Sequence, residues 1–394
     1  MPTFSKTNGG ALAAPFRREN LRATLWQSAL VLGIVAVIVL LALNARSALD
    51  ARGMTSGFGY LLSSAPFALG EGFFHFEAGE TYLAALGVGL GNTLALSAVS
   101  ILAATLLGTA FGLMRLSANP LVEGVARVYV ELFRNTPQLV QIIFWYTFFA
   151  TLPSPRDALS LAGLGFASNR GLTLPAPADG TTLMWVAVAL AAGIAAAVVL
   201  SRAFDRRRRR TGRRVPLARL VLAAVVLVPP VAVWALAGFP AGWSVPALKG
   251  FNYRGGVTLS PEFLAIYFGL SFYIAAFIAE IVRGGLASVD SGQIEAANAI
   301  GLPRADLYRR VVAPQALRVI IPPLSAQYVS LVKNSSLGVA VGYPELFSVS
   351  NTMLTYSGRT IEVLCVMAAV YLVISLTISA CANVLNALVQ IKER

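Results

Sequence analysis

The stretch from Arg283 to Pro323, RGGLASVDSGQIEAANAIGLPRADLYRRVVAPQALRVIIPP, decides how this chain folds. It is a polar, charged interruption between two long apolar runs, Pro261–Val282 and Leu324–Gly342. Loops without a role are usually short, so the length of this one indicates a function. Its residues predict two helices that meet at a glycine, with the short first helix offered to a partner in water.

Local signals place the helices of this loop. Glu295-Ala296-Ala297 are strong helix formers, and Gly301 is suited to the end of a helix. Pro303 favours the start of the next helix. Pro314 and then Pro322-Pro323 lack the amide hydrogen that a helix interior needs, so we expect them to interrupt the helix before the next apolar run begins.

The composition is that of an integral membrane protein. Of the 394 residues, 57% are hydrophobic and only 12% are charged, and the mean hydropathy is +0.71. A soluble domain carries about twice that charged fraction. The net charge of +13 comes from basic residues at the edges of apolar runs, which is the pattern of cytoplasmic loops rather than of a nucleic-acid groove.

Eight apolar runs predict an all-α protein with about eight transmembrane helices. They are Leu25–Leu43, Leu83–Met114, Val125–Leu152, Leu183–Leu200, Leu217–Leu236, Pro261–Val282, Leu324–Gly342 and Glu362–Leu388. The basic N-terminal segment, the arginine block Arg206–Arg214 and the loop 283–323 then all lie in the cytoplasm, with both termini. We interpret the arginine block as an anchor at anionic lipid headgroups, because no aromatic residue is interleaved for nucleic-acid binding.

The first apolar run has a competing interpretation as a signal peptide, since small residues follow it from Ala42 to Ala48. Its core exceeds the usual signal core of about 7 to 15 residues, so a retained first span is favoured. Cys365 and Cys381 are the only cysteines and lie about 24 Å apart along one predicted helix, too far for a disulfide. His75 is the only histidine, so neither a metal site nor a catalytic triad is predicted.

The loop resembles a known motif. Glu295-Ala296-Ala297, three residues, Gly301, nine residues and then Val311-Val312-Ala313-Pro314 resembles the EAA loop of permease subunits in bacterial ABC importers. Val311 and Ala313 stand where that motif has Ile and Leu. The resemblance implies that the first short helix is a coupling helix, which docks on a separate ATPase subunit.

A second segment narrows the resemblance. Tyr129 to Tyr146, YVELFRNTPQLVQIIFWY, is similar to the amino-acid branch of these permeases, with Asn135 in place of Gly. Together with the long outer segments, it resembles the larger permease subunit of general L-amino-acid importers. The resemblance implies a five-helix permease core, residues 83–152 and 261–390, within a transmembrane domain 83–394. Residues 1–82 and the insertion 153–260, with two extra spans, are additions.

The resemblance also implies the partners and the chemistry. We expect an ATPase dimer that holds ATP and Mg²⁺, a second permease subunit, a periplasmic amino-acid-binding protein and membrane lipid, with no cofactor and no catalysis in this chain. The location is the bacterial inner membrane, and L-amino acids are the cargo. The residues expected to couple to the ATPase are Gln293, Glu295, Ala296, Ala297, Gly301 and Pro314.

Polar residues inside apolar runs are the candidates for the substrate pathway. Lys333, Asn334 and Ser335 lie in the seventh run, where a charge costs at least about 2.5 kcal/mol and should face water or a partner. Lys333 is predicted to meet the substrate carboxylate or, alternatively, to pair with an acid such as Glu131. Gln138, Gln141, Asn92 and Arg134 complete the set. Hydrogen bonds between helices, or an Arg134–Glu131 pair, are the competing roles.

Two other functions fit the sequence less well. An ion-gradient-driven transporter or channel needs ionisable groups within its spans, and the run Leu83–Met114 has none. A membrane-embedded enzyme needs a converging set of catalytic groups, which one histidine and scattered carboxylates do not provide. An ATP-driven importer is therefore the predicted function.

Overall fold

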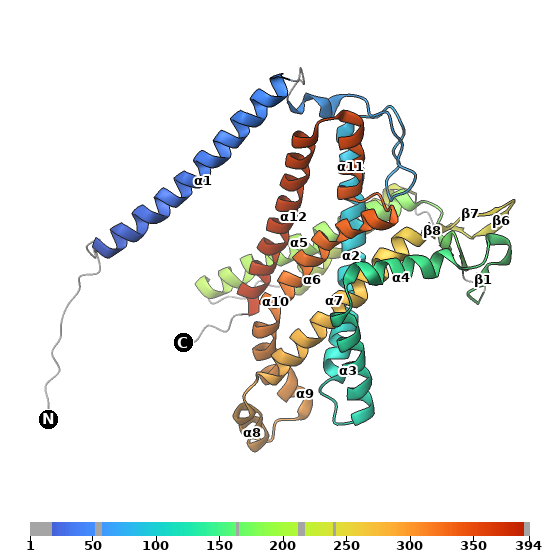
Figure 1. Ribbon diagram of the computed structural model, residues 1–394. Helices are drawn as coiled ribbons and strands as arrows, with labels where there is room; N and C mark the ends of the chain where they lie inside the picture. Colours follow the sequence, from blue (N-terminus) through green and yellow to red (C-terminus); the bar gives the residue numbers. More distant parts are fainter. Residues whose placement is uncertain (1–17, 52–56, 163–164, 212–216, 239–241, 390–394) are drawn as a thin grey trace.

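The computed structural model describes residues 18–51, 57–162, 165–211, 217–238 and 242–389. Helices dominate it, which confirms the predicted all-α membrane fold (Figure 1). In the described part of the chain, four helices have apolar stretches long enough to cross a membrane. They are α2 (Tyr82–Met114), α5 (Gly180–Thr211), α7 (Pro261–Ala287) and α12 (Thr360–Val389).

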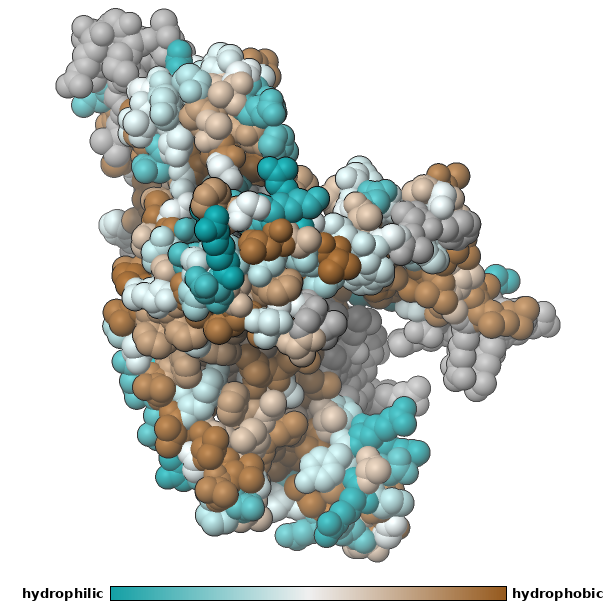
Figure 2. Space-filling view, turned by 90° about the vertical axis from the view of Figure 1, so that its right-hand side faces the viewer, coloured by the Kyte–Doolittle hydropathy of each residue, from teal (hydrophilic) through white to brown (hydrophobic). Residues whose placement is uncertain are grey.

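The other predicted spans correspond to helices with shorter apolar stretches. The first lies in α1 (Arg18–Ala51), which stands apart from the other helices in Figure 1. The fifth is α6 (Ala218–Leu236), which packs antiparallel against α5 as a hairpin. Apolar side chains cover much of the face shown in Figure 2, and hydrophilic ones gather at its lower end, at the level of α3, α8 and α9 in Figure 1.

Helices α2 and α7 form the centre of the bundle and make its most extensive contact. A Cβ atom added at Gly108 would lie 2.8 Å from the carbonyl oxygen of Ala275, and one at Gly112 would lie 2.8 Å from that of Ala279. Only glycine therefore allows this approach of the two helices, as expected where helices pack closely in membranes. The main apolar core, including Leu96, Ile142 and Leu331, surrounds this contact.

The third predicted span, Val125–Leu152, is not one helix. It divides into α3 (Pro120–Asn135) and α4 (Gln138–Ala150). Thr136 has an extended backbone, as is usual for a residue before proline, and Pro137 has no amide hydrogen to continue the helical ladder. The break lets α4 turn away from α3 and lie along α7 (Figure 1).

The predicted interruptions at Pro314 and at Pro322-Pro323 are wrong. The loop carries α8 (Ser291–Ala299), then α9 (Arg304–Leu307) and a π-helical turn (Tyr308–Val312), which leads without a break into α10 (Ala313–Asn334). Pro314 lies in the first turn of α10, directly after the wider π turn. Its missing amide hydrogen is tolerated there, because proline is tolerated in the first turn of a helix. Pro322 and Pro323 lie inside α10. The seventh apolar run then ends as a 3₁₀ turn, Ser335–Val341.

Short elements fill the segments between the long helices. Residues 344–358 contain α11 (Leu346–Ser357), whose buried face packs on α2. A 3₁₀ turn, Phe58–Leu62, lies between α1 and α2. The segments on either side of the α5–α6 hairpin form three small antiparallel sheets, in the orders β1-β2-β3-β8, β4-β5 and β6-β7.

The strands are two to four residues long. They are β1 (Leu159–Ser160), β2 (Phe166–Ser168), β3 (Gly171–Leu174), β4 (Ala176–Pro177), β5 (Trp243–Ser244), β6 (Ala247–Lys249), β7 (Asn252–Arg254) and β8 (Val257–Leu259). In β3–β8, Thr173 pairs with Thr258, so chain from before and after the hairpin closes one sheet. Helix α7 begins directly after β8 and ends directly before α8, so it joins the sheets to the coupling loop.

Candidate functional site

Helix α8 is held at both ends by local hydrogen bonds. At its start, the Gly292 amide donates to the Asp290 carboxylate over 2.6 Å. At its end, the Leu302 amide donates to the Ala297 carbonyl (3.1 Å) and the Gly301 amide to that of Asn298 (2.9 Å). Gly301 has φ +72°, a conformation that glycine adopts without steric cost. The predicted helix end at Gly301 is confirmed.

One face of α8 is exposed to solvent, and the opposite face packs against the rest of the loop. Ala297 is buried against Leu307 and Val312, which ties α8 to α9 and the π turn. Gln293, Glu295 and Ala296 are exposed. Ile300, directly after the helix, has 76% of its surface exposed. The structure thus presents three of the predicted coupling residues to solvent and uses Ala297 and Gly301 to hold the helix in place.

Five charged side chains join the base of α7 to the turn between α2 and α3. Glu280 lies 3.3 Å from Arg115 and 2.9 Å from Arg283. Glu123 lies 3.5 Å from Arg115 and 2.9 Å from Arg127. Arg115, Glu123 and Glu280 are mostly shielded from solvent. Sequence analysis missed this cluster, because its members come from two segments that are far apart in the chain.

The structure brings two of the predicted pathway residues into contact. The Asn334 side-chain amide donates to the Gln138 carbonyl oxygen over 2.6 Å, which links α10 to the start of α4. The Gln138 side-chain nitrogen is buried and has no partner among the described residues. Lys333, beside them on α10, is exposed, and no acid pairs with it in the described part of the chain. The alternative Lys333–Glu131 pair is therefore not formed.

Two other pathway candidates make local structural hydrogen bonds. The Gln141 amide donates to the carbonyls of Phe133 (3.0 Å) and Thr136 (3.1 Å), which stabilises the break between α3 and α4. The Ser335 hydroxyl donates to the Val332 carbonyl.

Asn92 and Arg134 also have partners of their own. Asn92 accepts from the Phe73 amide and donates to the Pro344 carbonyl, both at 2.9 Å. Asn92 is fully buried and so connects the outer segment, α2 and the start of α11. The Arg134 guanidinium lies 5.2 Å from the centre of the Phe277 ring, and its predicted pair with Glu131 is absent from the described ion pairs.

Glu345 is a buried acid that the sequence analysis did not single out. It has no exposed surface and begins α11 by accepting from the amides of Phe347 (2.9 Å) and Ser348 (2.7 Å). The Tyr371 hydroxyl of α12 donates to the same carboxylate over 2.9 Å. Its position, an acid directly before an apolar helical run, is a helix-start signal that could have identified it.

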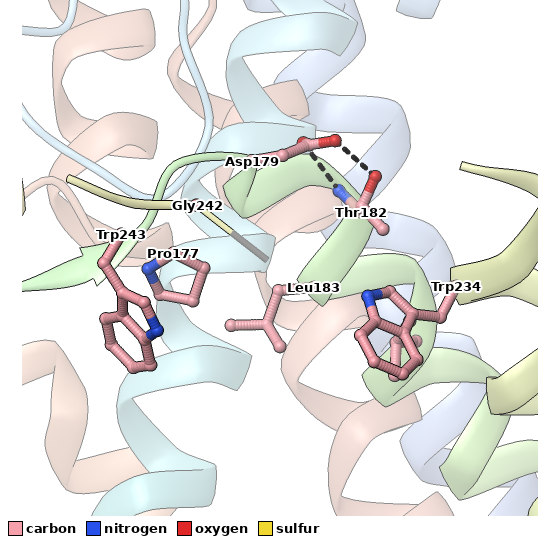
Figure 3. A pocket seen from close by; sticks show the side chains of 8 residues that line it. Pro177, Asp179, Thr182, Leu183, Trp234, Gly242 and Trp243 are labelled. Atoms are coloured by element: carbon pink, nitrogen blue, oxygen red, sulfur yellow. Dashed lines mark hydrogen bonds between the residues drawn. The ribbon is translucent and has the colours of Figure 1, made fainter. Parts of the chain in front are cut away.

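Two cavities lie beside the small sheets. One of about 360 Å³ opens between the start of α5, the end of α6 and the β4–β5 sheet, with Trp234 and Trp243 on its walls (Figure 3). Asp179 begins α5 beside it and accepts from the Thr182 amide and hydroxyl. An apolar groove of about 550 Å³ runs along α4 and α7.

Comparison with known proteins agrees with this architecture. Residues 189–393 match the family described as binding-protein-dependent transport system inner membrane component. The chain is 42% identical to the putative amino-acid ABC transporter permease protein YhdX of Escherichia coli, over 96% of this chain and 97% of that protein.

Two further relatives match over nearly their full length. The general L-amino acid transport system permease protein AapQ of Rhizobium johnstonii is 40% identical over 95% of this chain and 93% of that protein. The glutamate/glutamine/aspartate/asparagine transport system permease protein BztB of Rhodobacter capsulatus is 35% identical over 93% of each. From the family match and these identities, the chain belongs to the inner membrane components of binding-protein-dependent transport systems.

Proposed function

We propose that this chain is a permease subunit of an ATP-driven importer that carries L-amino acids across the inner membrane. The names of its relatives support amino acids as the cargo. The observation that carries the proposal is α8, a capped helix with exposed Gln293, Glu295 and Ile300, fixed from behind by Ala297. Such a rigid, exposed helix is suited to receive a mechanical push from a partner.

The push would come from a separate ATPase subunit that holds ATP and Mg²⁺. Glu295 and Gln293 contact that subunit, and Gly301 fixes the angle at which α8 leaves the loop. Pro314 lies where the π turn joins α10, so a displacement of α8 is passed to α7 on one side and α10 on the other. Alternating access to a central passage then follows from movement of these helices against the rest of the bundle.

The remaining partners follow from the same arrangement. Both termini and the loop 283–323 lie in the cytoplasm, and the segments 57–81 and 242–260 lie outside, where a binding protein delivers the amino acid. A second permease subunit faces this one across the passage. Lys333, with Asn334 and Gln138 beside it, meets the carboxylate of the amino acid, because an exposed ammonium on an apolar helix needs an anionic or aqueous partner.

Charge reversal at α8 tests the proposal. Glu295→Lys should abolish ATP-driven uptake of labelled amino acids in membrane vesicles while leaving insertion and assembly intact. Asp157→Lys, which reverses the charge of an exposed acid outside the coupling loop and outside these two segments, serves as the control. Unchanged uptake and unchanged ATPase stimulation in Glu295→Lys would contradict the proposal. Uptake that is driven by an ion gradient and needs no ATPase would instead favour the alternative function, an ion-gradient-driven transporter.

A further inference from the structure

A small pocket lies at the outer end of α7, between three separate segments of the chain. It has a volume of about 90 Å³. Glu71 and Phe73 line it from the outer segment, Ser260 and Phe263 from the start of α7, and Tyr343 from the turn before α11. The segments meet because Asn92 fixes the Phe73 amide, and Gly72 (φ +147°) leaves room for the Asn92 side chain.

Two polar groups of this pocket lack a charge partner or a hydrogen-bond partner among the described residues. The Glu71 carboxylate accepts from the Ser260 hydroxyl, but no cation pairs with it among the residues that the structure describes. The Tyr343 side chain is 1% exposed, and its hydroxyl has no hydrogen-bond partner in the described chain. A buried hydroxyl without a partner costs stability, so its presence here needs an explanation.

Three aromatic rings line the same pocket as the acid. The centre of the Phe263 ring lies 5.6 Å from that of Phe73 and 5.9 Å from that of Tyr343. A pocket lined by a carboxylate and aromatic rings attracts an ammonium group, because the rings and the acid both stabilise a positive charge. The wall that carries Ser260 is also the N-terminus of α7, whose dipole stabilises the acids there, Glu262 of its first turn and the hydrogen-bonded Glu71. The pocket therefore suits an ammonium group.

A second, apolar space lies directly beside the pocket. The groove of about 550 Å³ along α4 and α7 shares Phe73, Leu259 and Phe263 with it. Trp145 and Phe268 line the groove farther along. A ligand can thus place a charged head in the small pocket and an apolar tail in the groove.

We propose that this pocket is an outer binding site for an amino acid with an apolar side chain. The α-ammonium group binds the Glu71 carboxylate and the Tyr343 hydroxyl, and the side chain enters the aromatic groove. The inference rests on the proposed amino-acid import and deepens it, since it names a site and a substrate class. The site lies on the outer side of the bundle, at the end of α7 remote from the coupling helix.

Direct binding of L-phenylalanine tests the site. The full chain, with its co-purified partners in lipid nanodiscs and without nucleotide, is titrated with L-phenylalanine and with N-acetyl-L-phenylalanine, which has no ammonium group. Loss of a charge-assisted hydrogen bond predicts that Glu71→Gln weakens L-phenylalanine binding about tenfold or more. The N-acetyl compound should bind weakly to both forms.

A second variant separates binding from folding. Tyr343→Phe removes only a hydroxyl that has no partner in the free chain, so it should leave the melting temperature unchanged and still weaken binding several-fold. Glu77→Gln, the same change at an exposed position of the same segment, should bind like the unmodified protein.

The outcomes are decisive in both directions. Absence of L-phenylalanine binding, equal binding by the Glu71→Gln and unmodified proteins, or an equal loss in Glu77→Gln would overturn the inference. These results are independent of the proposed function, because ATP-driven uptake of other amino acids is measured separately. Uptake without binding at this pocket would remove the site and leave the importer intact.

Discussion

The ion-pair cluster at the base of α7 gives the sharpest test of how movement leaves the coupling loop. Glu280 contacts Arg115 at 3.3 Å and Arg283 at 2.9 Å, and 21% of its side chain is exposed. It therefore joins the end of α7 to the turn between α2 and α3. We expect Glu280→Gln to loosen this joint, so that a push on α8 no longer moves α2, α3 and α7 together.

The size of the effect follows from burial. Exposed ion pairs contribute about 0.2–1 kcal/mol, and removing one partner of a fully buried pair costs about 3–5 kcal/mol. Glu280 lies between these limits and leaves Arg115 with Glu123 alone, so a loss of about 1.5 kcal/mol is expected, equivalent to about tenfold in an equilibrium or rate constant.

The assay is uptake per ATP hydrolysed, with the complex reconstituted in proteoliposomes. Glu280→Gln should lower this ratio by about five- to tenfold, while ATP hydrolysis itself continues. Arg127→Gln, which removes an exposed member of the same cluster, should change the ratio less than about twofold. A double-mutant cycle of Glu280→Gln with Arg115→Gln should show that the two losses do not add. Additive effects, or equal ratios for Glu280→Gln and the unmodified protein, would refute the reasoning.

Three further predictions concern packing, the passage and pH. Gly108→Leu should prevent assembly, because its side chain would meet the Ala275 carbonyl and Ile278 of α7, whereas Gly87→Leu faces open space and should assemble normally on size-exclusion chromatography. Lys333→Met should lower the uptake of amino acids without changing ATP hydrolysis by the complex, and normal uptake of every amino acid would remove Lys333 from the passage. Burial raises the pKa of Glu71 above its usual value; the nearby Glu262 charge acts in the same direction and the Ser260 hydrogen bond opposes it. The folded state then binds this proton more tightly than the unfolded state. Stability should therefore fall as pH rises from the usual carboxyl range through the raised pKa, and Glu71→Gln should remove this part of the pH dependence of the melting temperature.

The coupling loop was readable from sequence because its signals are local. Strong helix formers at Glu295-Ala296-Ala297 and the glycine at Gly301, which adopts positive φ, lie within a few residues of one another. The same local logic failed at Pro322 and Pro323. Proline is expected to interrupt a helix, yet α10 continues through both residues and packs against α7 and α12.

The candidate pathway and pocket residues were harder to predict than the coupling loop, because their positions depend on contacts between segments that are distant in the sequence. Asn92 is a polar residue in an apolar run, which is typical of a pathway residue. Its side-chain amide is instead hydrogen-bonded to the Phe73 amide and the Pro344 carbonyl, the latter far away in the sequence. The Glu71 pocket and the Glu280 cluster also bring together segments that are far apart in the chain, and no spacing rule in a single sequence predicts such contacts. Strand β3 pairs with β8, and β4 with β5, across the α5–α6 hairpin, so these pairings too were not predictable from alternation over two to four residues.

The most direct measurement of the central claim is cross-linking from the exposed face of α8. With Cys365 and Cys381 first replaced by serine, a Glu295→Cys or Ile300→Cys variant is treated with a short thiol cross-linker in sealed, right-side-out vesicles and after permeabilisation. The account predicts one cross-linked product, with the ATPase subunit, and labelling by an impermeant thiol reagent only after permeabilisation. Labelling from the outside in sealed vesicles, or a loop that cross-links to no ATPase, would contradict it.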